Sequence, residues 1–142
     1  MAKLSGLIRL KKHELDQYRQ ALANLQEKLA QQQNAKDNML VQLEQEKNLA
    51  SVDMDAARNF NAYLQRSLQR LQEMERAIHD TQQEIQAARR VIQDAFMEVK
   101  KLDITEENRA QAEKDELNRK ISNELDDIGL VGFMRNHAGE TD

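Results

Sequence analysis

The chain has 142 residues, with no proline, no cysteine, no tryptophan and only four glycines. Charged residues make up 32% of the chain and aromatic residues 4%, and 21 basic against 25 acidic side chains leave a net charge of -4. Strands favour β-branched and aromatic residues and turns favour Gly or Pro, so this composition excludes a sheet protein and a doubly wound nucleotide-binding fold. The mild acidity argues against nucleic acid as the main partner. The composition is typical of long helices with one apolar stripe.

The first third of the chain carries apolar residues at alternating spacings of three and four, which is the a/d pattern of a coiled-coil core. These residues are Leu4, Ile8, Leu15, Tyr18, Leu22, Leu25, Leu29, Met39 and Leu43. Lys11, Gln32 and Lys36 fill three further core positions with polar side chains. Polar core residues lower the stability of a coiled coil but help to fix its register. The pattern predicts a first helix over residues 4–48.

The apolar pattern fades after Leu43, and the segment NLASVDMD (48–55) gathers Asn, Ser and Asp. These residues cap helices and bend chains. We therefore predict a reversal over residues 49–55, which would place Leu43 opposite Phe60.

A single continuous helix that dimerises in parallel is the alternative, because Leu43 and Leu64 are three heptads apart and the phase is kept. The antiparallel hairpin is favoured because a continuous coiled coil rarely loses four core positions in a row. In the hairpin, Met39 meets Leu64 and Leu25 meets Ile78.

The second apolar run is stricter and longer than the first. One core position recurs every seven residues at Leu64, Leu71, Ile78, Ile85, Ile92 and Val99, and the other is filled by Phe60, Met74, Ala88, Ala95 and Leu102. We predict a second helix over residues 56–128 that overhangs the hairpin and carries a second stripe, Leu117, Ile121, Leu125 and Ile128, out of phase with the first. Gly129 is expected to cap this helix. A flexible tail over residues 129–142 is expected to follow, so the fold class is an all-α, two-helix coiled-coil hairpin.

No motif in the sequence indicates catalysis or cofactor binding. His13, His79 and His137 are far apart, and none is followed four residues later by a second ligand on the same helix face. A two-helix rod has no room for a pocket that shifts the pKa of a carboxylate. We expect no enzyme activity, no metal, no cofactor and no small-molecule substrate. No stretch approaches the roughly 18–20 apolar residues of a transmembrane helix, and the lack of cysteine fits a reducing cytoplasm.

Three segments of the second helix carry a resemblance to a known family. They are FNAYLQRSLQRL (60–71), VKKLDITEENR (99–109) and NRKISNELDDIG (118–129). Together with the isoleucine heptads they make the chain resemble the FliJ family of flagellar protein-export components over nearly its whole length. Within the last segment, Asp127 stands where the family usually has Glu.

The resemblance implies a fold, partners and a location. FliJ-type proteins are antiparallel two-helix coiled coils similar to the central stalk of rotary ATPases. They bind the hexameric export ATPase, contact the cytoplasmic domain of the membrane export gate, and escort substrate chaperones. The resemblance thus implies a chain that is cytoplasmic and peripherally associated with the inner face of the cell membrane at the flagellar base. The hairpin itself predicts a monomer when free. A homodimeric structural adaptor without a transport role is the alternative.

The resemblance also implies two groups of binding residues. The group expected to bind the export ATPase is Arg109, Leu117, Arg119, Ile121, Leu125 and Asp126. The group expected to bind the export gate is Tyr63, Ser67, Arg70 and Met74. Family members carry more apolar residues at some of the gate positions, so Ser67 and Arg70 are departures from the family pattern.

Overall fold

Two long helices form the structure, a computed structural model that describes the backbone of residues 2–140 and the side chains of residues 4–136. The helices are α1 (Ala2–Ala50) and α2 (Met54–Glu140), and the described residues contain no strand. The chain divides into two compact units, one of residues 11–97 and one of residues 1–10 and 98–142.

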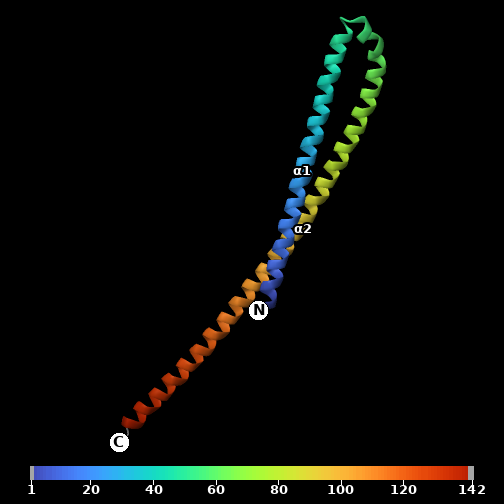
Figure 1. Cartoon of the computed structure of the whole chain (residues 1–142). Coiled ribbons are helices and arrows are strands. Elements are labelled where there is room, and N and C mark those ends of the chain that lie inside the picture. Colours follow the sequence, from blue (N-terminus) through green and yellow to red (C-terminus); the bar gives the residue numbers. More distant parts are fainter. Residues whose placement is uncertain (1, 141–142) are drawn as a thin grey trace. The chain divides into compact units, whose positions relative to one another are not determined.

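The unit of residues 11–97 is an antiparallel helical hairpin, in which α1 and α2 lie side by side and residues 51–53 join them (Figure 1). The reversal falls inside the predicted turn of residues 49–55, so the prediction of a hairpin is confirmed and a continuous helix is excluded.

The turn is built from short polar side chains. The Ser51 hydroxyl donates a hydrogen bond to the Asn48 carbonyl oxygen at 2.6 Å, which satisfies a carbonyl group at the end of α1. The backbone N–H of Asp55 donates to Asp53 Oδ1 at 2.9 Å, so Asp53 is the N-cap of α2. No residue in the described part of the chain has a positive φ angle, so this turn needs no glycine.

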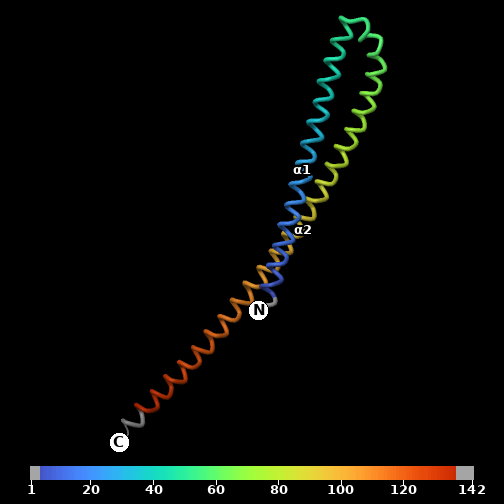
Figure 2. Tube along the Cα trace, viewed as in Figure 1, coloured from blue at the N-terminus to red at the C-terminus, as the bar shows by residue number. Residues whose placement is uncertain are grey.

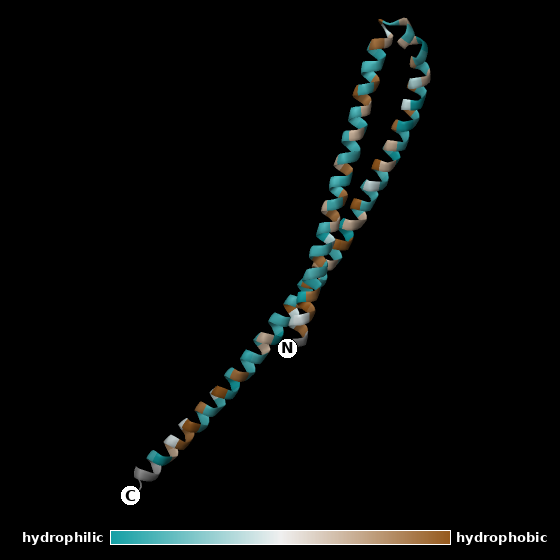
Figure 3. Ribbon diagram, in the orientation of Figure 1, coloured by the Kyte–Doolittle hydropathy of each residue, from teal (hydrophilic) through white to brown (hydrophobic). Residues whose placement is uncertain are grey.

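The hairpin core follows the predicted heptads. Its most buried apolar side chains are Leu15, Leu71, Ile78 and Ile85, and Figure 3 shows hydrophobic residues interspersed with hydrophilic ones along both helices. Met39 borders the same cleft as Tyr63 and Ser67. The predicted pairings of Met39 with Leu64 and of Leu25 with Ile78 stay predictions.

Two small polar residues complete the core of α2. Ser67 is 3% exposed and Thr81 is 1% exposed, and both are buried more deeply than any apolar side chain in the structure. The Thr81 hydroxyl donates a hydrogen bond to the Ala77 carbonyl oxygen at 3.0 Å, so this buried donor is satisfied within the helix. Both residues lie on the seven-residue repeat that contains Phe60 and Met74, and this spacing could have identified them.

The predicted polar core positions of α1 are partly buried. Lys11, Gln32 and Lys36 are all half-buried, and Lys36 Nζ lies 3.4 Å from Glu75 Oε1 on α2. The Gln32 side-chain oxygen Oε1 is buried without a hydrogen-bond partner.

In the other unit, burial is confined to a few side chains. Ile8 and Val99 are buried, and Leu4, Leu102, Asp103 and Glu106 are half-buried. Every residue from 107 to 136 is exposed. The overhang of the second helix stays a prediction.

The predicted helix end at Gly129 is wrong, because α2 continues through Gly129 and Gly132 to Glu140. Figure 2 shows the Cα trace of α2 as an unbroken coil up to the part drawn in grey. Glycine usually ends a helix by adopting a left-handed backbone conformation, and neither of these glycines has a positive φ angle. No proline follows to stop the helix. The predicted tail of residues 129–142 is therefore helical as far as Glu140, and residues 141 and 142 lie outside the described residues.

Candidate functional site

The two groups of residues implied by the family resemblance both lie on α2, one in each compact unit. The expected gate-binding residues fall between Tyr63 and Met74, in the hairpin. The expected ATPase-binding residues fall between Arg109 and Asp126, in the unit that contains the C-terminal part of α2. The two groups are therefore described as separate surfaces.

The gate-binding group is not uniformly at the surface. Arg70 is exposed, Tyr63 and Met74 are half-buried, and Ser67 is buried in the hairpin core. Arg70 and part of Tyr63 are therefore accessible at the surface, whereas Ser67 is not.

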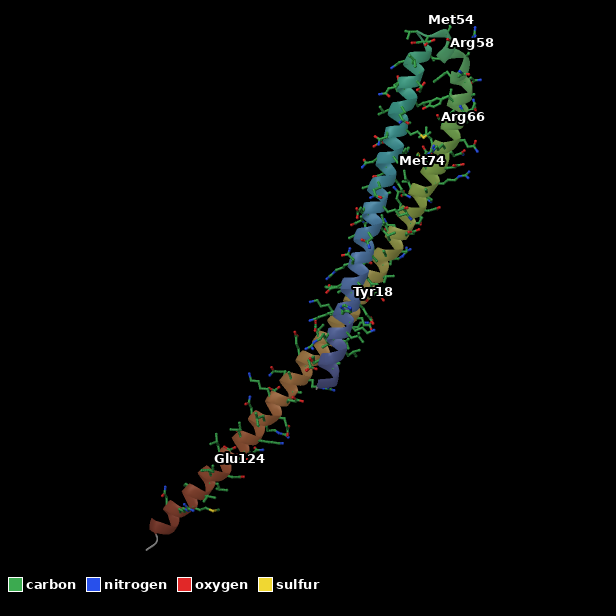
Figure 4. All side chains as sticks on the ribbon, viewed as in Figure 1. Tyr18, Met54, Arg58, Arg66, Met74 and Glu124 are labelled. Carbon is green, nitrogen blue, oxygen red and sulfur yellow. The ribbon has the colours of Figure 1, made fainter. Side chains whose placement is uncertain are left out.

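The structure brings three members of this group together around one cleft. This mid-hairpin cleft, of about 330 Å³, is lined by Met39, Gln42, Tyr63, Arg66, Ser67 and Arg70. Met74 does not line it. Arg66, labelled on α2 in Figure 4, was not among the residues expected from the sequence. Its position one helical turn before Arg70 is the signal that could have identified it.

The mid-hairpin cleft carries two positive charges and no negative one. Arg66 and Arg70 are exposed, and neither guanidinium forms a hydrogen bond or an ion pair with the described side chains. Met39 and the Tyr63 ring supply apolar surface beside these charges. The cleft can therefore accept an anionic group that is attached to an apolar one.

The second surface is a stripe of four large apolar side chains on α2, which we call the C-terminal stripe. Its members and their exposed fractions are Leu117 at 57%, Ile121 at 46%, Leu125 at 62% and Ile128 at 67%. Spacings of four, four and three residues place them on one face of an α-helix. No other part of the described structure covers them.

The charged members of the expected ATPase-binding group are placed differently from the C-terminal stripe. By helical periodicity, Arg119 and Asp126 lie on the face of α2 opposite the stripe. Arg119 is already paired, because its Nη2 lies 2.6 Å from Glu116 Oε1. Arg109 and Leu117 line one shallow depression on α2. The structure thus joins Leu117, Ile121 and Leu125 into one surface and leaves the charged residues at its sides or behind it.

A comparison with known protein families gives a match over nearly the whole chain. The family model described as "Flagellar FliJ protein" matches residues 1–138. The chain belongs to the FliJ family. This FliJ-family chain is accordingly a component of the flagellar export apparatus. No curated protein and no solved structure matches it.

The remaining candidates for chemistry in this FliJ-family chain are its histidines. His13 and His79 are exposed and lie on different helices, and the side chain of His137 lies outside the described residues. Among the side chains that the structure describes, no group of three or more His, Asp or Glu residues is placed to hold a metal ion. In the same range, neither helix has a stretch long and apolar enough to cross a membrane.

Proposed function

We propose that this FliJ-family chain is a non-enzymatic coiled-coil rod that binds the hexameric flagellar export ATPase and the cytoplasmic domain of the export gate, and that it escorts substrate chaperones. The proposal places it in the cytoplasm, at the inner face of the membrane below the flagellum. The observation that carries the proposal is the C-terminal stripe, four large apolar side chains on one helix face that are each about half exposed or more.

An uncovered apolar stripe of this kind is a feature of helices that dock into a groove of another protein. The spacing i, i+4, i+8, i+11 of Leu117, Ile121, Leu125 and Ile128 is the anchor pattern of such helices. Covering four side chains of this size releases about 25 cal/mol for each Å² of apolar surface removed from water. A contiguous apolar patch on a chain this polar therefore favours a partner that covers it.

The ATPase contact is tested by placing a charge inside the C-terminal stripe. We expect Leu117→Asp and Ile121→Asp to weaken ATPase binding at least tenfold, because each would bury a carboxylate in an apolar contact. Asn123→Asp is the matched control, since it adds the same charge to the same exposed stretch, on the face away from the stripe.

Two measurements are made together on the purified full-length chain and the export ATPase of the same organism. We expect the wild-type chain to promote hexamer assembly and to raise ATP turnover at substoichiometric amounts. Circular dichroism confirms that each variant keeps its helical content. Equal binding by Leu117→Asp, Ile121→Asp and Asn123→Asp would exclude the C-terminal stripe as the ATPase contact.

The gate contact is proposed for the hairpin surface around the mid-hairpin cleft. We expect Tyr63→Ala to weaken binding to the gate's cytoplasmic domain and to impair swimming, because Tyr63 is the aromatic side chain of that cleft. Tyr18→Ala is the control, since it removes the other tyrosine of the chain from α1. A similar loss of swimming in both variants would indicate a general effect on hairpin stability and would count against the site.

The proposal also includes a monomeric chain in the free state. Because the hairpin pairs the two helices within one chain, we expect a solution mass of 16.5 kDa. A mass twice as large would favour a homodimeric adaptor.

A further inference from the structure

The mid-hairpin cleft has a charge pattern that the stability of the hairpin does not require. Arg66 and Arg70 are four residues apart on α2, so their side chains are neighbours on one helix face, with Cβ atoms roughly 5–6 Å apart. Like charges at this spacing lower helix stability by a few tenths of a kcal/mol.

Neither arginine is neutralised within the hairpin. Glu73 lies three residues after Arg70, at a spacing that allows an ion pair, yet the structure forms none between them. Lys36 and Arg119, by contrast, each have a carboxylate within ion-pair distance.

Three other clefts on the described part of the helices do not share this excess of positive charge. The cleft next to Ile78 contains Lys36 and Asp37, and the depression next to Leu117 contains two acidic and two basic residues. A third cleft contains Glu75, Arg76 and Asp80. The uncompensated pair of arginines distinguishes the mid-hairpin cleft from these three clefts, and a local charge conflict without an internal benefit indicates a functional surface.

We propose that the mid-hairpin cleft binds an acidic segment of a partner protein, with an Asp or Glu carboxylate held by Arg66 and Arg70 and an adjacent apolar side chain against Met39 and Tyr63. Guanidinium groups bind carboxylates through two parallel hydrogen bonds, which gives geometric specificity as well as energy. The buried Ser67 lines the floor of the cleft and keeps it open, since a larger side chain here would fill it.

The surroundings of the cleft favour discrete carboxylates over a nucleic acid backbone. A phosphate backbone needs a run of cations along its path. The neighbouring stretches of the two helices instead carry Asp37, Glu44, Glu73 and Glu75, and the chain as a whole has a net charge of -4. A short acidic segment can pair with the two arginines while the four carboxylates of the hairpin itself stay in solvent.

This inference deepens the proposed gate contact, and it rests on that proposal for the identity of the partner. It changes the expected chemistry of the contact, because an apolar surface at these positions would bind through hydrophobic burial alone. Arg66 and Arg70 are exposed at the rim of the cleft, so they are expected to act mainly on the association rate and its salt dependence.

The test compares two double variants of the full-length chain that lose the same charge. The cleft variant, Arg66→Gln/Arg70→Gln, removes both positive charges from the mid-hairpin cleft. The control variant, Arg89→Gln/Arg90→Gln, removes two exposed arginines of α2 that line none of the clefts described above. Binding to the gate's cytoplasmic domain is measured by biolayer interferometry over a range of salt concentrations. We expect the cleft variant to bind about tenfold more weakly, with slower association and a smaller salt dependence, and the control variant to bind as the wild type does.

A second probe separates failure of the inference from failure of the proposed function. It is a short fluorescein-labelled peptide with two glutamates and two leucines, measured by fluorescence anisotropy against a twin that has glutamines in place of the glutamates. We expect the wild type to prefer the glutamate peptide, and the cleft variant to lose that preference.

The outcomes are distinct. If the gate domain binds all three proteins equally, the inference is overturned and the gate contact stands. If the gate domain does not bind the wild type, the gate contact fails, and the peptide preference then decides the inference alone. A wild type without preference for glutamate, or one that binds a polyuridine oligomer more tightly than the peptide through the same arginines, overturns the acidic-segment inference.

Discussion

Lys36 Nζ on α1 lies 3.4 Å from Glu75 Oε1 on α2, and this ion pair joins a core position of one helix to the flank of the other. The side chain of Lys36 is 30% exposed and that of Glu75 is 60% exposed. Lys36 therefore lays its aliphatic chain along the core and keeps its ammonium group near solvent. An ion pair this exposed contributes at most about 1 kcal/mol to stability.

The first prediction is that Lys36→Leu stabilises the hairpin. The substitution replaces a charged core side chain with the residue that neighbouring core positions use, and the gain from burial is expected to exceed the loss of the ion pair. We expect the free energy of unfolding to rise by about 1 kcal/mol, measured by urea denaturation followed by circular dichroism. Lys47→Leu, at an exposed position in the last turn of α1, should change it little. A loss of stability specific to Lys36→Leu would show that the ion pair outweighs burial.

The second prediction contrasts two threonines of α2 that make the same backbone hydrogen bond. Thr81 donates to Ala77 O at 3.0 Å and Thr105 donates to Lys101 O at 2.8 Å, but Thr81 is buried and Thr105 is exposed. We expect Thr81→Asp to lower the free energy of unfolding by at least about 3 kcal/mol, because a carboxylate would be buried without a partner. Thr105→Asp should cost less than about 0.5 kcal/mol.

Thermal unfolding of the two variants decides this prediction. Thr81→Val serves as a further control, because it keeps the volume of Thr81 and removes only a hydroxyl that is satisfied locally, so it should be neutral or stabilising. Equal destabilisation by Thr81→Asp and Thr105→Asp would mean that Thr81 is not in a solvent-excluded core.

The long heptad repeats made most of the fold predictable. The seven-residue repeat from Leu64 to Val99 is typical of a coiled-coil core, and its members Ile78 and Ile85 are buried. The turn was predictable because Ser51 and Asp53 are residues that cap helices, and both do so here.

The helix end at Gly129 was not predictable from residue types. Glycine is compatible with a helix interior and with a helix end, and only the φ angle distinguishes the two. Ser67 and Thr81 carry no apolar signal as small polar residues, and only their place on the seven-residue repeat of Phe60 and Met74 could have identified them as core positions. For the binding surfaces, periodicity in the sequence was enough to identify the C-terminal stripe.

The mid-hairpin cleft could not be identified in the same way. It depends on the fold, because α1 places Met39 and Gln42 beside Arg66 and Arg70 of α2.

The third prediction concerns the N-cap of α2. Asp53→Ala removes the oxygen that accepts the hydrogen bond from Asp55 N–H, so we expect the hairpin to lose about 1 kcal/mol of stability. Asp53→Asn keeps an acceptor oxygen at this position and should therefore retain nearly all of the wild-type stability. Both are measured by urea denaturation under the same conditions. If the two variants lost stability equally, the charge of Asp53 rather than its capping bond would be responsible.

The fourth prediction tests the continuation of α2 beyond Gly129. A Cβ atom built at Gly129 would have no neighbouring atom within 4 Å, and its φ angle is not positive, so alanine fits without strain. Alanine is favoured over glycine in a helix interior by about 1 kcal/mol. We expect Gly129→Ala to slow amide hydrogen exchange in residues 125–136, as followed by NMR. Gly129→Pro should instead accelerate it, because proline removes a helical hydrogen bond and clashes with the preceding turn. If Gly129 capped the helix in a left-handed conformation, alanine would be the strained residue there, and Gly129→Ala would accelerate exchange rather than slow it.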